Sequence, residues 1–250
     1  MYTLKKSLGQ HFLIDESVSQ RIVDTLQQQM PERLLEVGPG GGALTKYLLR
    51  LPAVDFRCVE VDDEKVQWLL KEFPELRGRI IPESILDIPA PFQLPFTIVG
   101  NFPYNISTQI VFRILEWKDL VTTMVGMFQK EVAERIVSRE GSKVYGVTSV
   151  LVQAFYSAEN LFEVGQEAFN PPPKVKSTVI RLTRKSMDTR FKSERAFFVL
   201  VKTAFSQRRK TLRNAVKSLF DAQTLEDPVF SKRAEQLSVE VFGELTFKMV

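Results

Sequence analysis

The chain has 250 residues, a mass of 28.6 kDa, 44% hydrophobic residues and a formal net charge of +4. This composition supports a packed core and excludes disordered and fibrous proteins. The single cysteine, Cys58, excludes an internal disulfide, and the single histidine, His11, excludes a metal site built from a histidine cluster. No apolar run reaches the roughly 18 residues of a membrane span, and a secretion signal is not recognisable. We therefore expect a cytoplasmic protein that uses neither a membrane nor a metal.

The predicted elements start with an amphipathic helix at 16–30, whose apolar side carries Val18 and Ile22. Short apolar runs that suit buried strands then alternate with helical stretches. The strands are expected at 33–37, 56–61, 79–81, 96–99 and 121–127, and the helices at 43–51, 64–73 and 108–117. This alternation predicts a mostly parallel, doubly wound α/β sheet with right-handed crossovers. Two later runs, 160–165 and 177–183, are expected to close the sheet with an antiparallel edge.

The last quarter of the chain has a different pattern. From Glu194 onward the apolar spacing is helical, and no further strand is expected. We place a domain boundary near 185–190. The two predicted domains are 1–187, which contains the sheet, and 188–250, a small helical domain.

The excess of positive charge also lies in that last quarter. Residues 1–185 contain 22 basic and 22 acidic residues, whereas 186–250 contain 12 basic and 8 acidic residues. A basic run without any acidic residue comprises Arg195, Lys202, Arg208, Arg209, Lys210, Arg213 and Lys217. Such a run can neutralise phosphates, so nucleic acid would bind there in a salt-dependent way. The alternative is a solvated helix face.

A glycine-rich turn follows the first predicted strand and leads into a helix. Gly38, Gly40 and Gly42 permit positive φ values and close backbone approach, and the helix start offers free N–H groups. This is the geometry of a site for a nucleotide-derived cofactor. Two features argue against a dinucleotide as the cofactor. The glycine spacing is not G-x-G-x-x-G. Glu36, just before the turn, would repel a pyrophosphate but suit the cationic amino group of S-adenosylmethionine. The alternative is a tight loop without a ligand.

An acidic residue ends the next predicted strand, about 20 residues after the glycines. At that distance a carboxylate can hold a ribose diol bidentately, and we predict that Glu60 has this role. Asp62 is instead interpreted as a helix N-cap before Glu64. Together with the glycine turn, Glu60 predicts S-adenosylmethionine as the cofactor.

The run Asn101-Phe102-Pro103-Tyr104 follows the fourth predicted strand, at the same sheet edge. It suits methyl transfer to an exocyclic amine, because the Asn101 side-chain oxygen and the Phe102 backbone carbonyl can accept its two hydrogens and orient its lone pair. Pro103 fixes that backbone, and Tyr104 offers a ring on which an unstacked base can lie. The alternative is a strand-end turn in which Tyr104 is an ordinary buried aromatic.

With these features the chain resembles the rRNA adenine dimethyltransferase family, and within it the KsgA-type enzymes of the small subunit. The resemblance extends from Lys5 to about Ser218. It rests on six motifs in order: Lys5–Leu13, Glu36–Gly40, Asn101–Tyr104, Gln129–Arg135, Phe169–Ser177 and Arg208–Asn214. It implies a Rossmann-like class I methyltransferase sheet with a C-terminal helical domain.

The resemblance also implies roles for individual residues. His11 and Leu13 would contact the cofactor from the N-terminal segment, and Phe169 would stack on the adenine opposite Tyr104. The other cofactor contacts would come from Glu36, Gly38, Gly40, Glu60, Ser84 and Asn101, and the substrate contacts from Tyr104, Phe169, Arg208, Arg209, Lys210 and Arg213. On sequence pattern alone, Phe169 reads as an ordinary core aromatic.

Two positions depart from the family pattern. Family members usually have an aspartate that accepts from the adenine amine of the cofactor, and Ser84 stands at that position. A serine lacks the charge assistance, which lowers cofactor affinity by about 1 kcal/mol unless Glu83 replaces it. Phe102 replaces a small aliphatic residue, but only its backbone has a role.

The resemblance implies a function: dimethylation of two adjacent adenosines in the 3′-end hairpin of small-subunit rRNA, late in assembly. The partner would be the rRNA of a pre-30S particle, gripped by a basic C-terminal helix, and the enzyme would be a monomer. Two alternatives stay open. One is Erm-type methylation of large-subunit rRNA, and the other is an assembly factor that binds pre-30S particles without methylating them.

Overall fold

A computed structural model describes residues 11–27, 30–52, 54–186 and 189–250. The first part of the motif at Lys5–Leu13, up to Gln10, and the expected boundary between 187 and 188 lie outside these residues. The chain divides into two compact units. The first combines Met1–Ala133 with Glu159–Arg184, and the second combines Glu134–Ala158 with Lys185–Val250.

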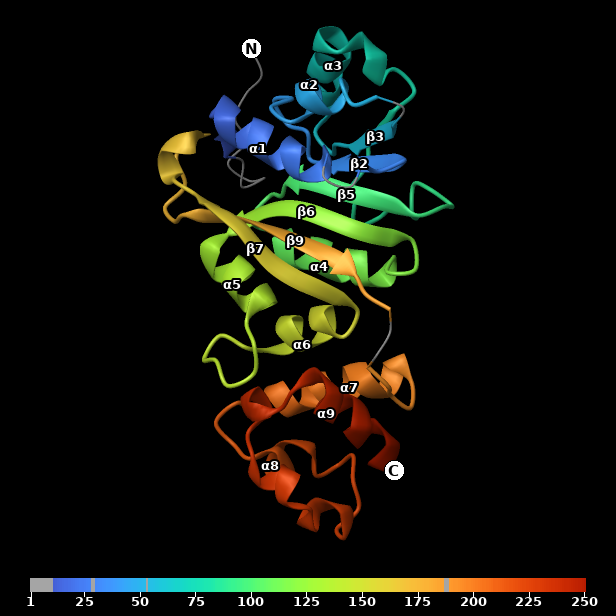
Figure 1. The fold of residues 1–250 in the computed structure, drawn as a ribbon, viewed down its shortest axis with the longest axis vertical. Helices are drawn as coiled ribbons and strands as arrows, with labels where there is room; N and C mark the ends of the chain where they lie inside the picture. The colour runs from blue at the N-terminus through green and yellow to red at the C-terminus, as the bar shows by residue number, and fades with distance from the viewer. Residues whose placement is uncertain (1–10, 28–29, 53, 187–188) are drawn as a thin grey trace. The chain divides into compact units, whose positions relative to one another are not determined.

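The elements alternate between strands and helices through the first two thirds of the chain (Figure 1). The strands are β1 (Phe12–Leu13), β2 (Arg33–Val37), β3 (Asp55–Val59), β4 (Ile80–Ile81), β5 (Phe96–Asn101), β6 (Val121–Gln129), β7 (Tyr156–Val164), β8 (Phe169–Asn170) and β9 (Ser177–Arg184). The α-helices are α1 (Glu16–Gln27), α2 (Thr45–Leu48), α3 (Asp63–Glu72), α4 (Ser107–Glu116), α5 (Lys130–Val137), α6 (Val147–Gln153), α7 (Glu194–Phe205), α8 (Leu212–Val216) and α9 (Val239–Leu245).

Seven strands form one sheet in the order β4-β3-β2-β5-β6-β9-β7. The pairs from β4 to β6 are parallel, with Leu35 opposite Arg57 on one side and Ile98 on the other. β9 pairs antiparallel with β6, with Gly126 opposite Ile180. The prediction of a mostly parallel methyltransferase-type sheet with an antiparallel edge is confirmed. Because β2 and β5 are parallel neighbours, their carboxyl ends lie at the same edge of the sheet.

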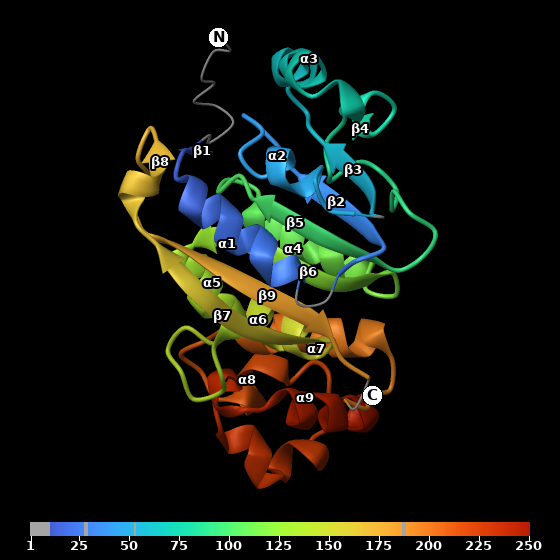
Figure 2. The same ribbon diagram turned by 45° about the horizontal axis from the view of Figure 1, so that its top comes forward.

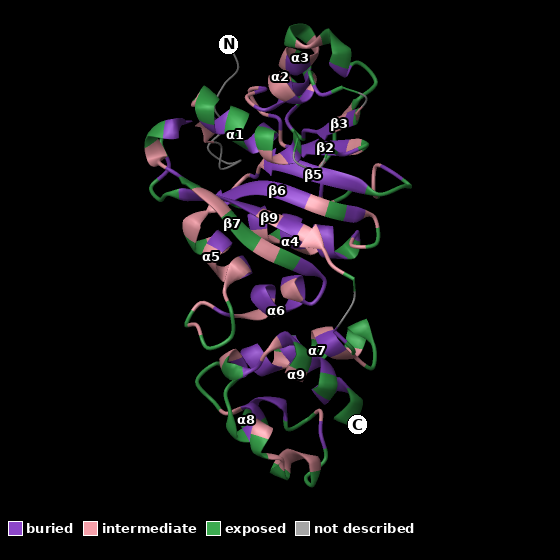
Figure 3. Ribbon diagram, in the orientation of Figure 1, coloured by how far each residue is buried: buried purple, intermediate pink, exposed green. Residues whose placement is uncertain are grey.

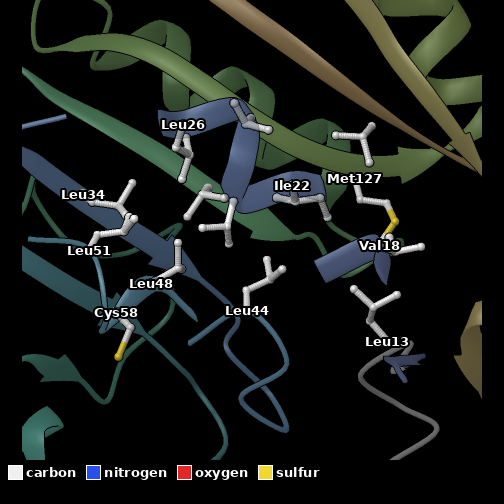
Figure 4. Packing of buried hydrophobic residues seen from close by; sticks show 14 of the residues in the cluster. Leu13, Val18, Ile22, Leu26, Leu34, Leu44, Leu48, Leu51, Cys58 and Met127 are labelled. Carbon is white, nitrogen blue, oxygen red and sulfur yellow. The ribbon is translucent and has the colours of Figure 1, made fainter. Parts of the chain in front are cut away.

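The core of the first unit lies between the sheet and its helices. Figure 2 shows α1 and α4 on opposite faces of the sheet. Val18, Ile22 and Leu26 of α1 belong to one hydrophobic cluster with Leu44 and Leu48, and Figure 4 shows Val18 beside Leu13 and Met127. The central strands β2, β5 and β6 are buried over most of their length (Figure 3), as expected of strands covered on both faces.

Several predicted bounds differ from the observed ones. α1 covers Glu16–Gln27 of the predicted 16–30, and residues 28–29 lie outside the described residues. α2, Thr45–Leu48, is one short turn inside the predicted 43–51. β7 begins at Tyr156, before the expected 160–165. A small sheet that the sequence did not predict pairs β1 with β8, with Leu13 opposite Phe169. This pair fixes the N-terminal segment beside the large sheet.

The second unit is helical, and its core is rich in aromatic side chains. Phe205 of α7 lies 5.9 Å from Phe242 of α9 between ring centroids, and Phe155 lies 6.0 Å from Phe191. Segment 134–158 groups with this unit, whereas we expected one boundary near 187. The reason is packing, because α6 carries buried apolar side chains that contact α7. Within the described residues, none of the helices has the length and apolar character of a membrane span.

Candidate functional site

A cavity of about 680 Å³ opens at the edge of the sheet where β2, β3 and β5 end. Its walls come from the turn after β2, the end of β3, the loop after β4, the loop after β5 and the N-terminal segment. The predicted residues that line it are His11, Leu13, Glu36, Gly38, Gly40, Glu60, Ser84, Asn101, Phe102, Pro103 and Tyr104. The structure therefore brings most of the predicted site together, all within the first unit.

The glycine turn adopts a conformation that suits glycine. Gly38 and Gly40 have φ values of +69° and +56°, which place them in the left-handed region. The Gly38 amide donates to the Val59 carbonyl at 2.9 Å, and the Gly40 amide donates to Glu60 Oε2 at 3.1 Å. Glu60 Oε1 also accepts from the Asp62 amide at 3.0 Å. Glu60 thus joins the end of β3 to the turn, at the rim where a ribose would lie.

Asp62 has the structural role that the sequence predicted. Its Oδ1 accepts from the Glu64 amide at 3.1 Å and caps α3. The interpretation as a helix N-cap is confirmed.

Glu36 is buried at the end of β2, with 1% of its surface exposed. Its Oε2 accepts from the Thr45 hydroxyl at 2.7 Å. Burial raises the pKa of this carboxyl to about 8, the Thr45 hydrogen bond opposes the shift, and the charge of Glu60 adds to it. Without a cation beside it, Glu36 is therefore neutral at pH 7, whereas we expected it to be charged.

The N-terminal segment forms one wall of the cavity. The Asn101 side-chain amide donates from Nδ2 to the His11 carbonyl at 3.2 Å, and His11 Nδ1 lies 2.8 Å from the Pro171 carbonyl oxygen. The Phe12 ring lies beneath Lys65 Nζ, 5.0 Å from its centroid. A Cβ on Gly40 would come within 3.3 Å of the same ring. Only the family resemblance indicated that His11 would lie at this site.

Asn101 ends β5, and the next residues turn the chain away from the sheet. The Phe102 amide donates to the Met127 carbonyl at 3.3 Å, which fixes the peptide after Asn101. The Phe102 ring is buried over the sheet, where a Cβ on Gly126 would lie only 2.2 Å from it. The glycine in β6 therefore makes room for this large side chain, and the departure from a small aliphatic residue is accommodated.

Tyr104 is half-buried beside the cavity. Its hydroxyl lies 2.5 Å from the Ser177 hydroxyl, and its ring stacks on His11 with 5.4 Å between centroids and an interplanar angle of 29°. Burial raises the pKa of Tyr104, and the bond to Ser177 opposes that shift. The phenol therefore stays neutral at physiological pH.

Phe169 does not line the cavity in this structure. It is 2% exposed, and its side chain belongs to the hydrophobic core of the first unit. The pairing with Leu13 in the small β1-β8 sheet holds it there. This position is that of a core aromatic, as the sequence pattern alone indicated, and the stacking role of Phe169 opposite Tyr104 stays a prediction.

Ser84 lines the cavity in the loop after β4 and is half-buried. Its Oγ accepts from the Leu86 amide at 3.2 Å and so caps a local turn. Glu83 is exposed and also lines the cavity. Ser84 and Glu83, the two residues considered as replacements for the family's aspartate, therefore both line the cavity in the loop after β4.

The basic segment of the second unit is not helical where its charges are densest. Arg208, Arg209 and Lys210 lie in the turn between α7 and α8, which corrects the expectation of a basic helix. The reason is that α7, which contains Arg195 and Lys202, ends at Phe205, three residues before Arg208. All three side chains are exposed.

Two of the predicted phosphate ligands also make contacts within the protein. Arg208 Nη2 donates to the carbonyls of Lys143 and Tyr145 at 2.8 and 3.2 Å. Arg213 Nε donates to the Leu225 carbonyl at 2.9 Å. Arg208 and Arg213 thus anchor other segments of the second unit. The side chains of Arg209 and Lys210 make no hydrogen bond to the described part of the chain.

Sequence reasoning missed three polar residues of the site. Thr45 bonds Glu36, Lys65 lies on Phe12, and Ser177 bonds Tyr104. Thr45 begins the helix after the glycine turn, and Ser177 is the last residue of the motif Phe169–Ser177. Their positions in or beside these motifs were the signal that could have identified them. In the part of the chain that the structure describes, no three His, Cys, Asp or Glu side chains gather as a metal site requires.

A family model and two bacterial relatives match nearly the whole chain. Residues 1–243 match the family model described as "Ribosomal RNA adenine dimethylase". The "Ribosomal RNA small subunit methyltransferase A" of Flavobacterium johnsoniae is 53% identical, over 98% of this chain and 95% of that protein. The protein of the same description from Parabacteroides distasonis is 50% identical, over 97% of this chain and 92% of its own length.

Solved structures show the same fold. A dimethyladenosine transferase from Plasmodium falciparum superposes with a TM-score of 0.80 at 24% identity, covering 93% of this chain and 94% of that one. The 23S rRNA methyltransferase ErmE gives a TM-score of 0.71 at 22% identity, covering 93% and 99%. At these identities the likeness concerns the fold, including the antiparallel edge and the C-terminal helices.

Proposed function

The chain belongs to the ribosomal RNA adenine dimethylase family, and from that premise we propose that it dimethylates two adjacent adenosines in the 3′-end hairpin of small-subunit rRNA. Relatives about half identical over nearly the whole chain are small-subunit methyltransferases. The observation that carries the proposal is the Asn101 amide, held at the mouth of the cofactor cavity by the His11 carbonyl. We further propose that the enzyme works as a cytoplasmic monomer on a pre-30S particle.

The cavity fits S-adenosylmethionine, which supplies an electrophilic methyl group when it is bound. Its volume of about 680 Å³ is of the size that cofactors occupy. Gly38 and Gly40 leave the backbone open where a Cβ would narrow the turn. Glu60 offers carboxylate oxygens toward a ribose diol, and Glu36 lies where it would ionise beside an ammonium group. Ser84 stands at the wall assigned to the adenine.

Asn101 and Phe102 would orient the target amine. Because Asn101 Nδ2 donates to His11, the amide is turned so that Oδ1 is its remaining acceptor. Oδ1 and the Phe102 carbonyl would each accept one hydrogen of the exocyclic amine and aim its lone pair at the methyl group. The nitrogen would then accept the methyl group that bound S-adenosylmethionine supplies, and the amine would release its proton to solvent.

Tyr104 would support the unstacked adenine on its ring face. His11 stacks on one face of the ring, and the proposal places the base on the other face. The exposed cations Arg209 and Lys210 of the second unit would neutralise rRNA phosphates and position the hairpin.

Two alternatives are distinguished by the substrate. Erm-type methylation would modify a large-subunit adenosine. The relatives that are about half identical are instead described as small-subunit methyltransferases. An assembly factor without chemistry would bind small subunits and leave the adenosines unmodified. The intact run from Asn101 to Tyr104 at the cavity supports an enzyme.

The test is to incubate the purified chain with labelled S-adenosylmethionine and, separately, with unmodified small or large ribosomal subunits. Modified bases are then mapped by mass spectrometry. We expect a pair of dimethyladenosines in the small-subunit 3′ hairpin. Small subunits that already carry the modification are the matched control and should incorporate no label.

Other outcomes would overturn the proposal. A modified adenosine in the large subunit would identify the Erm-type activity. Retained binding of small subunits without any incorporation would identify an assembly factor.

A further inference from the structure

Ser177 touches the polar end of Tyr104 from the antiparallel edge of the sheet. Its Oγ lies 2.5 Å from the Tyr104 hydroxyl oxygen, and its surface is 0% exposed. The Ser177 hydroxyl is therefore shielded from water, whereas Tyr104 is half-buried. It joins the first residue of β9 to the loop after β5.

The backbone around Ser177 is fixed on both sides. Ser177 pairs with Gln129 in the β6-β9 ladder, and the Lys130 amide donates to the Lys176 carbonyl at 2.9 Å. The hydroxyl therefore occupies a defined position relative to the end of β6. A fixed partner of this kind restrains the side chain that it bonds.

His11 restrains the same ring in a different way. A tyrosine hydroxyl lies on the axis about which the ring turns, so a bond to it sets the direction of that axis but not the plane of the ring. The stacked His11 ring, at 5.4 Å and 29°, sets the plane. His11 is in turn held at 2.8 Å from the Pro171 carbonyl. Segment 169–177 thus restrains Tyr104 at both points.

We propose that Ser177 is a positioning residue that holds the Tyr104 ring in the orientation needed for methyl transfer. The proposal rests on the proposed function, in which the target adenine lies on that ring. Ser177 contacts the hydroxyl end of Tyr104 and is not among the described residues that line the cavity. Its effect on the reaction therefore passes through Tyr104. A base on a ring that can tilt still binds, but its amine meets the methyl group in the productive geometry less often.

The experiment compares Ser177→Ala, Tyr104→Phe and the double variant, with kcat and KM measured on unmodified small subunits. Each single variant removes the same hydrogen bond and keeps an aromatic ring at 104. We expect kcat to fall about fivefold in each, with KM within about twofold. The double variant should be no slower than the slower single variant, because the two changes share one interaction.

Ser19→Ala is the matched control. Ser19 is also a buried serine, and its hydroxyl bonds the Asp15 carbonyl at the start of α1. Its removal should leave kcat unchanged. Losses that multiply in the double variant, or an unchanged kcat in Ser177→Ala, would overturn the proposal while the methylation itself stands.

A second measurement does not depend on methylation. The chain has five tyrosines, so ¹³C labelling of their rings gives few signals, and Tyr104→Phe identifies the one from Tyr104. Ser177→Ala should shift and broaden that signal and leave the other four in place. An unchanged signal would refute the positioning role. If the wild-type chain methylates nothing but the signal responds, the proposed function fails and the restraint on Tyr104 stands.

Discussion

The cavity at the sheet edge and the basic segment around Arg208 to Lys217 present their polar groups in different ways. In the cavity, Glu36 accepts a hydrogen bond from Thr45, and Asn101 donates one to the His11 carbonyl. In the basic segment the cations are exposed, and under the proposed function they would act through their summed charge. The first region should therefore depend on individual atoms, and the second on how many charges it presents.

The largest effect should follow from Asn101→Ala. Removing the amide takes away the acceptor for the target amine, so the methylation rate should fall by about a hundredfold or more. Single-turnover methylation of small subunits measures this loss. Asn160→Ala, which changes an exposed amide on β7, is the matched control and should keep the wild-type rate. Full activity in Asn101→Ala would disprove the orienting role.

Cofactor affinity should depend on pH through Glu36. Its pKa of about 8 means that the free protein carries a proton there at pH 6 to 7. An ammonium group beside it favours the carboxylate, so binding releases a proton and affinity rises with pH, by about tenfold from pH 6 to pH 7. Calorimetry in buffers of different ionisation enthalpy measures both quantities. Glu36→Gln should bind more weakly at pH 7 and show a flat profile. A pH-dependent profile in that variant would show that another group is responsible.

The basic segment should respond to salt where the cavity does not. Replacing both Arg209 and Lys210 by alanine should weaken small-subunit binding about tenfold and lower the slope of log affinity against log salt by about 1.5. The rate at saturating substrate should stay the same. Arg208→Ala should instead lower the unfolding temperature, because Arg208 holds the Lys143 and Tyr145 carbonyls. Equal salt slopes in the double variant and the wild type would argue against RNA contact there.

The sequence predicted the large sheet well because buried parallel strands leave a continuous apolar run. β2 was expected at 33–37 and lies at Arg33–Val37. β1 and β8 were not predicted, because two residues are too few to show an alternation of apolar and polar side chains. Their pairing also depends on residues far apart in the chain. That pairing is also what buries Phe169.

The site was predictable where a motif is local. Asn101 ends β5, Gly38 and Glu60 directly follow β2 and β3, and parallel topology brings these strand ends together. The raised pKa of Glu36 and the bond from Ser177 to Tyr104 could not be predicted, because both depend on which distant groups cover a side chain. His11 became a site residue through family resemblance alone.

The smallest effect should come from Ser84→Asp, which tests whether the cavity lacks one charged acceptor. Ser84 already accepts from the Leu86 amide at 3.2 Å, and an aspartate can make the same turn bond with one oxygen and offer the other to the cofactor's adenine amine. Charge assistance should then tighten S-adenosylmethionine binding about fivefold. Titration calorimetry at pH 7 measures the change, with Ser84→Asn as the uncharged control of similar shape. If both variants bind like the wild type, Glu83 or the backbone already fills the role, and the family's aspartate is dispensable in this cavity.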